Sequence, residues 1–334
     1  KYGIDNYTWN VAASLVNASQ EFQKYLDIVE NNLKVEDLNE SQGSWPGSFK
    51  PARKYQERIL RPDNQSSTPA QAPFLPPPPL SHTTGGPSMV VTRSQTIGMH
   101  ALRIIRSPPF LRGSKRERSH SNSGEYDPSP DYKPSSTDGS SSGNPRPSRK
   151  KSKSGKEDAE NEVTVNTALI LFVEAVSELI PLLKCDWSPT QEMFVSKFNK
   201  AISRARIDGC LRTKAENSIQ ALVEVKAGSR GSKDEEKIQM QESAEMVSWL
   251  FRKPRNLPNL NGYRFLLSQD NDEIYLTFGS CDDGYLDYLK NPRTRCHGFL
   301  TMQTYGPWRI GKYLEMRHFA TEIVALTRLA HNAA

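Results

Sequence analysis

A long stretch of the chain, residues 42–161, constrains the fold most because it is rich in proline, serine and basic residues. Only 36% of the whole chain is hydrophobic, and it contains 23 prolines. Such a stretch buries too little apolar surface to offset the entropy lost on ordering, so we expect it to be disordered. The fold is then confined to a partly helical segment, residues 1–41, and one domain, residues 162–334.

Two parts of this linker suggest partners. The run Pro73–Pro79 favours a polyproline II rod, which can dock on aromatic-lined protein domains or serve as a stiff spacer. The basic residues within Arg146–Lys156 fit a nuclear import signal, a patch that binds phosphates or a solvated run of charge. Protein partners of the linker and a nuclear location are therefore both open.

The chain has no apolar run of the ~18–20 residues that a membrane helix needs. The closest stretch, Ala168–Leu183, is interrupted by Glu174, Glu178 and Pro181. No secretory signal is evident at the start. We therefore expect an intracellular protein without a membrane segment. The cysteines lack the spacing of a zinc site or a disulfide framework; they are Cys185, Cys210, Cys281 and Cys296.

The net charge of +6 is unevenly distributed. Residues 101–160 hold thirteen Lys and Arg against eight Asp and Glu, whereas residues 161–334 hold twenty-two against twenty-one. A domain that binds DNA tightly usually has a basic surface. The nearly neutral C-terminal part therefore argues against strong intrinsic affinity for DNA.

Apolar spacing predicts a helix over residues 7–35, either packed on the main domain, bound to a partner helix or marginal at a frayed terminus. Its apolar stripe comprises Val11, Leu15, Phe22, Tyr25, Leu26, Ile28 and Val29.

The C-terminal part predicts alternating helices and strands, an α/β fold with a mixed central sheet. The expected order is a helix from a cap at Asn166 or Thr167 to about Leu183, strands Met193–Phe198, Ala205–Leu211 and Ile219–Ala227, a helix Asp234–Phe251, a hairpin of Tyr263–Ser268 and Glu273–Phe278, and a helix Leu314–Ala330.

Helix Asp234–Phe251 is expected to bury one stripe and to border a cleft beside it. The expected buried residues are Met240, Ala244, Val247 and Phe251. Gln239 and Gln241 each lie about a quarter-turn from that stripe, at 3.6 residues per turn. Either glutamine can therefore face a cleft.

The strand Ile219–Ala227 carries Glu224 and Lys226 within apolar sequence, and Asp208 lies upstream. Alternation in a strand points Glu224 and Lys226 to the same face. Because buried charges are costly, charges in such a run usually have a partner or a task. The structural alternative is a cross-strand ion pair, with Asp208-Gly209 as an ordinary turn.

The chemical interpretation is a metal-dependent phosphodiesterase. Asp208 and Glu224 are two carboxylates that can hold Mg²⁺ or Mn²⁺, which prefer oxygen ligands. Such an ion neutralises developing charge and lowers the pKa of a bound water. Lys226 can orient that water or stabilise the transition state.

The element order and the Asp208…Glu224-x-Lys226 pattern resemble the PD-(D/E)XK nuclease superfamily. Residues 163 to 331 are similar to fungal proteins described as PD-(D/E)XK nuclease-like. The motifs that carry the resemblance are Ala168–Phe172, Arg206–Gly209, Val223–Lys226, Gln239–Glu242, Ser268–Asp270, Glu273–Phe278 and Tyr305–Trp308.

The resemblance implies a restriction-endonuclease-like fold, with Asp208 and Glu224 as metal ligands and Lys226 acting on the attacking water. The carbonyl oxygen of Val225 could add a ligand. It also implies that a glutamate of the first helix, Glu178 or Glu174, and a glutamine of the second helix, Gln241 or Gln239, complete the site. The proline of the family name is absent, because Ile207 precedes Asp208.

Three functions follow as expectations. The first is a Mg²⁺-dependent nuclease acting on DNA or RNA, with Asp208, Glu224, Lys226 and Gln241 as its site. The second is a catalytically inactive nuclease-like domain that binds nucleic acid or protein. The third is a peptide-binding or scaffolding role of residues 7–80, independent of the domain. The oligomeric state is left open.

Overall fold

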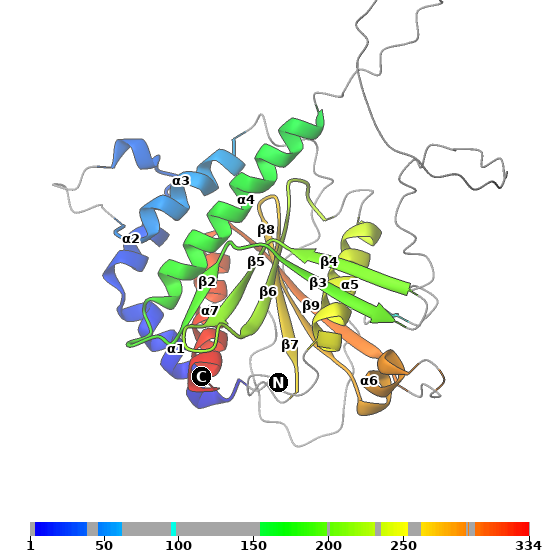
Figure 1. The fold of residues 1–334 in the computed structure, drawn as a ribbon. Coiled ribbons are helices and arrows are strands. Elements are labelled where there is room, and N and C mark those ends of the chain that lie inside the picture. The colour runs from blue at the N-terminus through cyan, green and yellow to red at the C-terminus, as the bar shows by residue number, and fades with distance from the viewer. Residues whose placement is uncertain are drawn as a thin grey trace, which may run out of the picture.

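A mixed seven-stranded sheet lies at the centre of the computed structural model, with helices on both faces (Figure 1). The mixed α/β architecture expected from the sequence is confirmed. The residues that the structure describes are 4–38, 46–61, 95–97, 154–198, 201–230, 235–252, 262–291, 293 and 298–333.

The described residues form the following elements in chain order. The helices are α1 (Asn6–Ala18), α2 (Gln20–Glu30), the short 3₁₀ helix η1 (Val35–Asp37), α3 (Phe49–Ile59), α4 (Ser154–Ser177), α5 (Glu235–Arg252), α6 (Asp283–Lys290) and α7 (Tyr313–Ala333). The strands are β1 (Gln95–Ile97), β2 (Cys185–Ser188), β3 (Glu192–Phe198), β4 (Ala201–Ile207), β5 (Gly209–Thr213), β6 (Ile219–Lys226), β7 (Arg264–Asp270), β8 (Glu273–Ser280) and β9 (Leu300–Arg309).

The sheet has the order β1-β9-β8-β7-β6-β5-β2, and β3 and β4 form a separate two-stranded sheet. Strands β6 and β7 are parallel, and the other neighbours are antiparallel. A parallel pair needs a crossover, which α5 supplies. Strands β7 and β8 form the predicted hairpin, whose turn places Asn271 at a φ of 57°. Asparagine tolerates this left-handed conformation better than most residues do.

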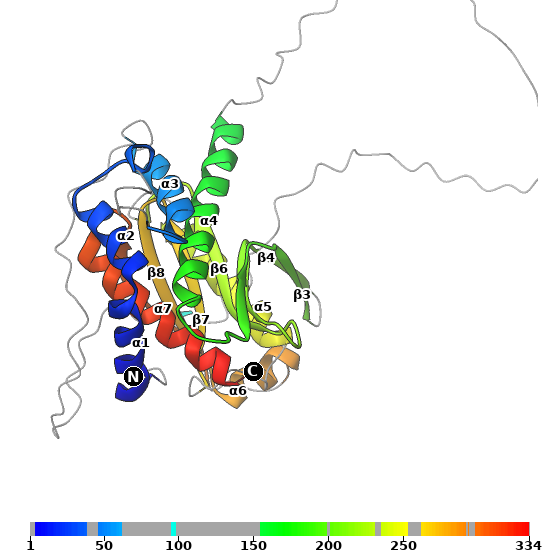
Figure 2. The same ribbon diagram turned by 90° about the vertical axis from the view of Figure 1, so that its left-hand side faces the viewer.

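One face of the sheet is covered by α4 and α7, with α1, α2 and α3 packed outside them (Figure 2). Aromatic side chains join these layers: Phe22, Tyr25 and Phe49 contact Phe172 of α4, which stacks on Phe319 of α7. Aromatic pairs of this kind contribute beyond their buried area. The N-terminal helices therefore share the core of the C-terminal part.

The opposite face is covered by α5, α6 and the β3–β4 sheet (Figure 1). Its core contains Phe194 and Ile207 from the small sheet, Leu222 and Leu266 from the central sheet, and Trp249 from α5. Strands β6 and β7 are thus buried on both faces. Strands covered on both faces usually read as apolar runs, but buried polar residues such as Glu224, Ser268 and Asp270 interrupt the apolar sequence here.

The prediction of a single helix over residues 7–35 is wrong, because the helical conformation is interrupted at Ser19. Ser19 is extended, and its side-chain oxygen accepts a hydrogen bond of 3.2 Å from the backbone N–H of Phe22. A serine N-cap of this type starts a new helix. The apolar stripe does bury Phe22, Tyr25, Leu26, Ile28 and Val29.

Two expected boundaries also need correction. Helix α3 (Phe49–Ile59) lies inside the stretch 42–161 that was expected to be disordered, and α4 begins at Ser154. Asn166 and Thr167 are therefore interior helix residues instead of caps. Thr167 Oγ1 donates to the carbonyl of Val163. The Pro73–Pro79 run lies outside the described residues, as do most of the basic residues within Arg146–Lys156.

Of the four residues predicted to form the buried stripe of α5, only Val247 is confirmed as buried. Met240 is 39% exposed, and Ala244 and Phe251 are only half-buried. The helix instead buries Ile238, Glu242, Glu245, Met246 and Trp249, among others. Two glutamates lie on the buried side: Arg230, from the turn after β6, pairs with Glu242, and Gln241 of α5 itself donates to Glu245.

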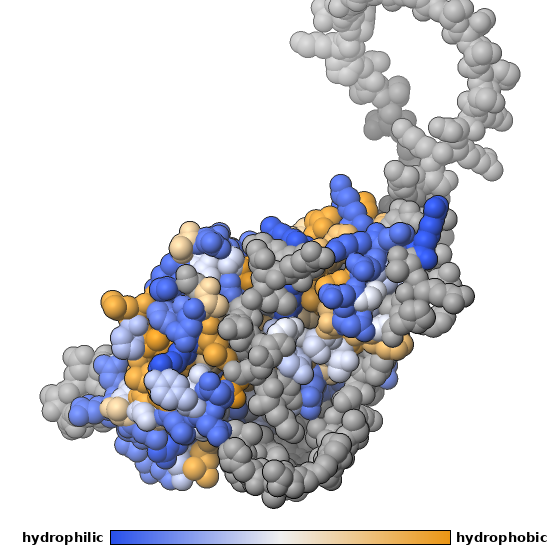
Figure 3. Space-filling model, turned by 90° about the horizontal axis from the view of Figure 1, so that it is seen from below, coloured by the Kyte–Doolittle hydropathy of each residue, from blue (hydrophilic) through white to orange (hydrophobic). Residues whose placement is uncertain are grey.

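The other predicted elements are present, although α4 ends at Ser177 instead of about Leu183 and Ala205–Leu211 divides between β4 and β5. Strands β1, β2 and β9 and helix α6 were not predicted. Hydrophilic and hydrophobic residues are interspersed on the face seen in Figure 3. None of the described helices combines the length and apolar character required to cross a membrane.

Candidate active site

Asp208 lies where the chain leaves β4 and enters β5, between the two sheets. Its backbone N–H donates to the carbonyl of Val223 at 3.0 Å. Gly209 follows because a side chain there would approach the carbonyl oxygen of Ser188 to 2.6 Å. The Asp-Gly dipeptide therefore connects a strand of the small sheet to a strand of the central sheet. The sequence alternative, an ordinary hairpin turn, is not what the structure shows.

The carboxylate of Asp208 is held against β6. Oδ2 accepts a hydrogen bond of 3.1 Å from the backbone N–H of Val225, and Oδ1 accepts one of 3.2 Å from Gln191 Nε2. Helix α4 contributes Asn166, whose Nδ2 donates to the Asp208 carbonyl oxygen at 3.0 Å. Three separate elements thus fix this residue.

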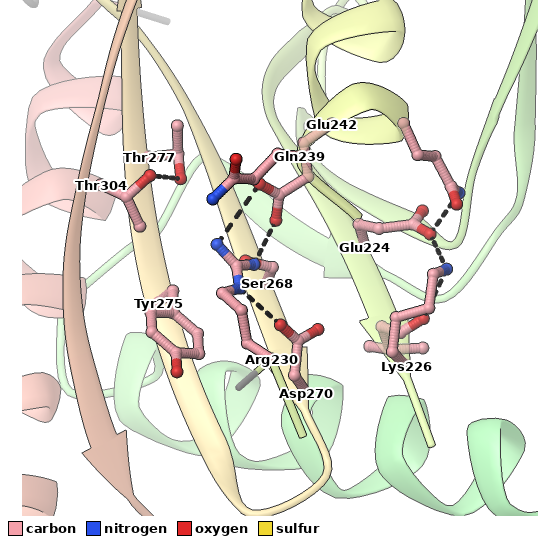
Figure 4. Close-up of polar contacts among 12 residues, drawn as sticks. Glu224, Lys226, Arg230, Gln239, Glu242, Ser268, Asp270, Tyr275, Thr277 and Thr304 are labelled. Atoms are coloured by element: carbon pink, nitrogen blue, oxygen red, sulfur yellow. Dashed lines mark hydrogen bonds and ion pairs between the residues drawn. The ribbon is translucent and has the colours of Figure 1, made fainter. Parts of the chain in front are cut away.

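Glu224 and Lys226 point to the same side of β6, as their spacing predicted (Figure 4). Lys226 Nζ donates to Glu224 Oε1 and to the carbonyl oxygen of Val225. Glu224 is 1% exposed, and its other oxygen, Oε2, has no hydrogen-bond partner among the described residues. A buried carboxylate oxygen without a partner is costly and requires an explanation.

Helix α5 reaches this cluster through Gln241. Its Nε2 donates to Glu224 Oε1 at 2.5 Å and to Glu245 Oε1 at 3.0 Å. Gln239 instead donates to Glu235 of its own helix. Of the two glutamines that the sequence left open, the structure brings Gln241 to the site.

Burial dominates the electrostatics of the cluster. It raises the pKa of Glu224 to about 8; the positive charge of Lys226 opposes this rise, and the negative charge of Asp208 adds to it. Burial and the neighbouring Glu224 also raise the pKa of Glu245 well above its ordinary value. Burial alone would lower the pKa of Lys226, but the adjacent Glu224 outweighs it, so that this pKa is raised.

The first-helix glutamates suggested by the resemblance do not join this cluster. Glu174 accepts a hydrogen bond of 2.9 Å from the backbone N–H of Trp187, and Glu178 is exposed. Glu174 lies eight residues beyond Asn166, about 12 Å along a helix that rises 1.5 Å per residue. The acid that α4 brings near the site is Glu162, whose charge raises the pKa of Lys226.

A second buried network, formed by the turn after β6 and by residues of β7, β8 and α5, lies beside the first (Figure 4). Arg230 Nε donates to Asp270 at 2.6 Å, and its terminal nitrogens donate to Glu242 at 2.5 Å and to Ser268 at 3.0 Å. The guanidinium lies over the ring of Tyr275, 4.1 Å from its centroid.

The two networks share a framework. Glu224 is in register with Ser268, and Lys226 with Asp270, on the parallel strands β6 and β7. Helix α5 adds Gln241 to one network and Glu242 to the other. The Arg230 network therefore ties α5 to β7 next to the candidate site.

Sequence reasoning missed Glu162, Glu242, Glu245 and Arg230. A signal existed only for the α5 glutamates, which lie three residues apart and so share one face of the helix. Among the described residues, no group of three or more His, Cys, Asp or Glu side chains is placed to hold a metal ion.

Comparisons with known proteins identify no relative of this chain: no family model, no curated protein and no solved structure matches it.

Proposed function

We propose that the chain is a divalent-metal-dependent nuclease whose site is formed by Asp208, Glu224, Lys226 and Gln241. The observation that carries the proposal is the hydrogen bond from the Val225 backbone N–H to Asp208 Oδ2. Val225 lies between Glu224 and Lys226, so this bond holds both acids and the lysine at one point on β6.

The donor set supports a hard divalent ion. Asp208 and Glu224 supply carboxylate oxygens, and Oε2 of Glu224 is buried without a partner among the described residues. Magnesium is commonly bound by one or two carboxylates, with substrate phosphates and waters completing its shell. Two acids are therefore sufficient, although no cluster of three is present in the described part of the chain.

The chemistry follows from the side chains. A divalent ion held by Asp208 and Glu224 would neutralise charge on the phosphodiester and favour ionisation of a bound water. The Lys226 ammonium orients that water and stabilises negative charge on the phosphorus oxygens. Gln241 keeps Glu224 oriented through its amide N–H. Glu224 must be ionised to bind the ion, so activity rises with pH towards its pKa.

The topology supports a restriction-endonuclease-like fold. Helix α4 is followed by the antiparallel strands β2, β5 and β6, and α5 then crosses to the parallel strand β7. This is the order of helix, strands, helix and hairpin strands on a mixed sheet that the resemblance led us to expect. A fold alone does not determine a reaction.

One observation favours a second candidate, an inactive module that binds without catalysis. Lys226 already pairs with Glu224, which is 1% exposed, and the pair could serve stability alone. In that case neither acid binds a metal, and replacement of Lys226 and Glu224 by apolar residues would leave function intact.

A cleavage assay separates the two candidates. The full chain is incubated with Mg²⁺ or Mn²⁺ and labelled single-stranded and duplex DNA and RNA. Metal-dependent cleavage is expected, with Asp208→Asn and Glu224→Gln each lowering kcat by at least about 100-fold. The exposed Asp287→Asn on α6 serves as the matched control and retains full activity. Cleavage that survives both site substitutions removes these acids from the mechanism.

A further inference from the structure

The small β3–β4 sheet has one buried and one exposed face. On the buried face, Phe194, Ser196, Ala205 and Ile207 pack towards α5 and the central sheet. Residues two apart in a strand point to the same side, so the alternate positions face outwards. We call the outward positions of β3 and β4 the ribbon face.

The ribbon face combines exposed apolar and basic residues. It consists of Met193, Val195 and Lys197 from β3 and Ile202, Arg204 and Arg206 from β4. The three apolar side chains are 52%, 49% and 58% exposed, in the order Met193, Val195, Ile202. None of these outward positions carries an acid, so the described ribbon face has three positive charges and no negative one.

The pairing register interleaves the two kinds of residue. Met193 lies opposite Arg206, Val195 opposite Arg204, and Lys197 opposite Ile202. Each pair therefore places one cation beside one apolar side chain along the whole ribbon. A ligand that matches this face carries regularly spaced negative charge next to apolar surface.

The ribbon begins and ends at the candidate site. Gln191 immediately precedes β3, Asp208 immediately follows β4, and the two side chains are hydrogen-bonded at 3.2 Å. The β3–β4 sheet extends from this point beside α5 (Figure 1). A long ligand lying along the ribbon face can therefore reach Asp208.

We propose that the ribbon face binds duplex DNA, with its cations on the phosphates and its apolar side chains on base edges. The inference rests on the proposed nuclease function, since it names the substrate class of that site. Two strands about 4.8 Å apart form a ribbon of the width that the major groove of B-DNA, about 12 Å wide, admits. The apolar side chains suit contact with thymine methyl groups.

Other nucleic acids fit this face less well. Single strands are usually held by stacking of bases on aromatic side chains, and no outward position of the described ribbon is aromatic. The major groove of duplex RNA is too narrow for side chains to read. The chemistry of the face therefore favours duplex DNA.

The near-neutral charge of residues 161–334 does not contradict this inference. Association with a charged ligand depends on the local distribution of charge on the protein surface as well as on the net charge. The three cations of the ribbon face are gathered on one side of two strands, whereas acids such as Glu224 and Glu242 are buried elsewhere. A count of charges over the sequence cannot reveal this separation.

Binding of labelled DNA by the full chain tests the inference. Fluorescence anisotropy is measured in EDTA, so that cleavage does not interfere, at several salt concentrations. The triple variant Lys197→Gln, Arg204→Gln, Arg206→Gln should reduce the slope of log K against log salt by about 2.7, at about 0.9 per phosphate contact. The control variant Lys34→Gln, Lys54→Gln, Lys290→Gln loses the same charge at exposed positions and should keep the slope.

A second variant examines the apolar contacts. Met193→Thr, Val195→Thr, Ile202→Thr keeps the charges and the strand preference, so it should weaken duplex binding without changing the salt slope. Wild-type chain should bind duplex DNA at least about tenfold more tightly than single-stranded DNA or duplex RNA of equal length, the preference expected from groove fit.

The outcomes separate this inference from the nuclease proposal. Absence of duplex binding, equal effects of the ribbon and control variants, or equal affinity for all three nucleic acids overturns the ribbon inference, even if Asp208→Asn abolishes cleavage. Ribbon-dependent DNA binding without any metal-dependent cleavage overturns the nuclease proposal and upholds the ribbon inference.

Discussion

Asp208 Oδ2 accepts a hydrogen bond of 3.1 Å from the backbone N–H of Val225. The bond joins the passage between the two sheets to the middle of β6. Side chains of Glu224 and Lys226 flank Val225 on the strand, so the position of Asp208 relative to both is fixed by the backbone. The site thus depends on strand pairing more than on flexible side chains.

The raised pKa of Glu224 predicts that stability falls with increasing pH. The folded carboxyl holds its proton up to a pKa of about 8, above its ordinary value of 4.5, so the folded state binds more protons between these values. The unfolding free energy should be highest below pH 4.5, as far as this group contributes, and decrease towards pH 8. Glu224→Gln should flatten part of this decrease, measured by thermal unfolding across pH.

A matched control exists on α7. Burial raises the pKa of Glu322 to about 7, so Glu322→Gln should flatten the profile only below that pH. Identical profiles for wild type and Glu224→Gln between pH 7 and 8 would contradict the assignment of a raised pKa to Glu224.

The two glutamines of α5 should differ in their effect on the pH profile of cleavage. Gln241 donates to Glu224 and stabilises its ionised form, so Gln241→Ala should raise the pKa of Glu224 further. One pKa unit would lower activity about tenfold on the acidic side of the profile. Gln239→Ala, which removes only a contact with Glu235, should leave the profile unchanged. Equal shifts for the two variants would exclude a positioning role of Gln241.

The first-helix acid is expected to be Glu162. Its negative charge raises the pKa of Lys226, so Glu162→Gln should move the alkaline limb of the cleavage profile to lower pH. Glu178→Gln, on the exposed side of the chain just after α4, should have no effect. If Glu178→Gln shifts the alkaline limb and Glu162→Gln does not, the first-helix acid is Glu178 instead of Glu162.

Arg230 should matter for stability more than the exposed Arg252. Removal of Arg230 leaves Glu242 and Asp270 buried without their cation, and breaking a buried pair in this way costs about 3–5 kcal/mol. Arg252 pairs with Glu192 but its side chain is 54% exposed, and such surface pairs are worth about 0–1 kcal/mol. Urea unfolding of Arg230→Met and Arg252→Met compares them. Equal losses of unfolding free energy in the two variants would contradict a stabilising role of the buried Arg230 pairs.

The local sequence pattern was sufficient to predict the strands that carry the candidate site. In β6, two charges inside an apolar run correctly indicated that Glu224 and Lys226 share one face. The hairpin of β7 and β8 was evident from turn chemistry at Asn271, and the last helix from its apolar spacing. In these elements the type of secondary structure follows from the local sequence, although β6 and β7 are buried on both faces instead of alternating between core and solvent.

Long-range compensation was not evident from the sequence. Glu242 is buried in α5 because Arg230, from the turn after β6, provides its partner, and no local pattern reveals this pair. The partner of Glu245 is Gln241, one turn earlier in the same helix. Glu162 was overlooked because α4 begins at Ser154, earlier than its expected caps. Packing of the N-terminal helices on Phe172 likewise depends on contacts between distant segments.

Isothermal calorimetry of the full chain with Mn²⁺ is the decisive measurement for metal binding by Asp208 and Glu224, because it needs no substrate. We expect saturable binding that Asp208→Asn and Glu224→Gln each weaken by more than about tenfold, as expected for loss of a ligand. The control Asp287→Asn should bind like the wild type. If the wild type binds no Mn²⁺, or if both site variants bind it as tightly as the wild type, Asp208 and Glu224 do not form a metal site.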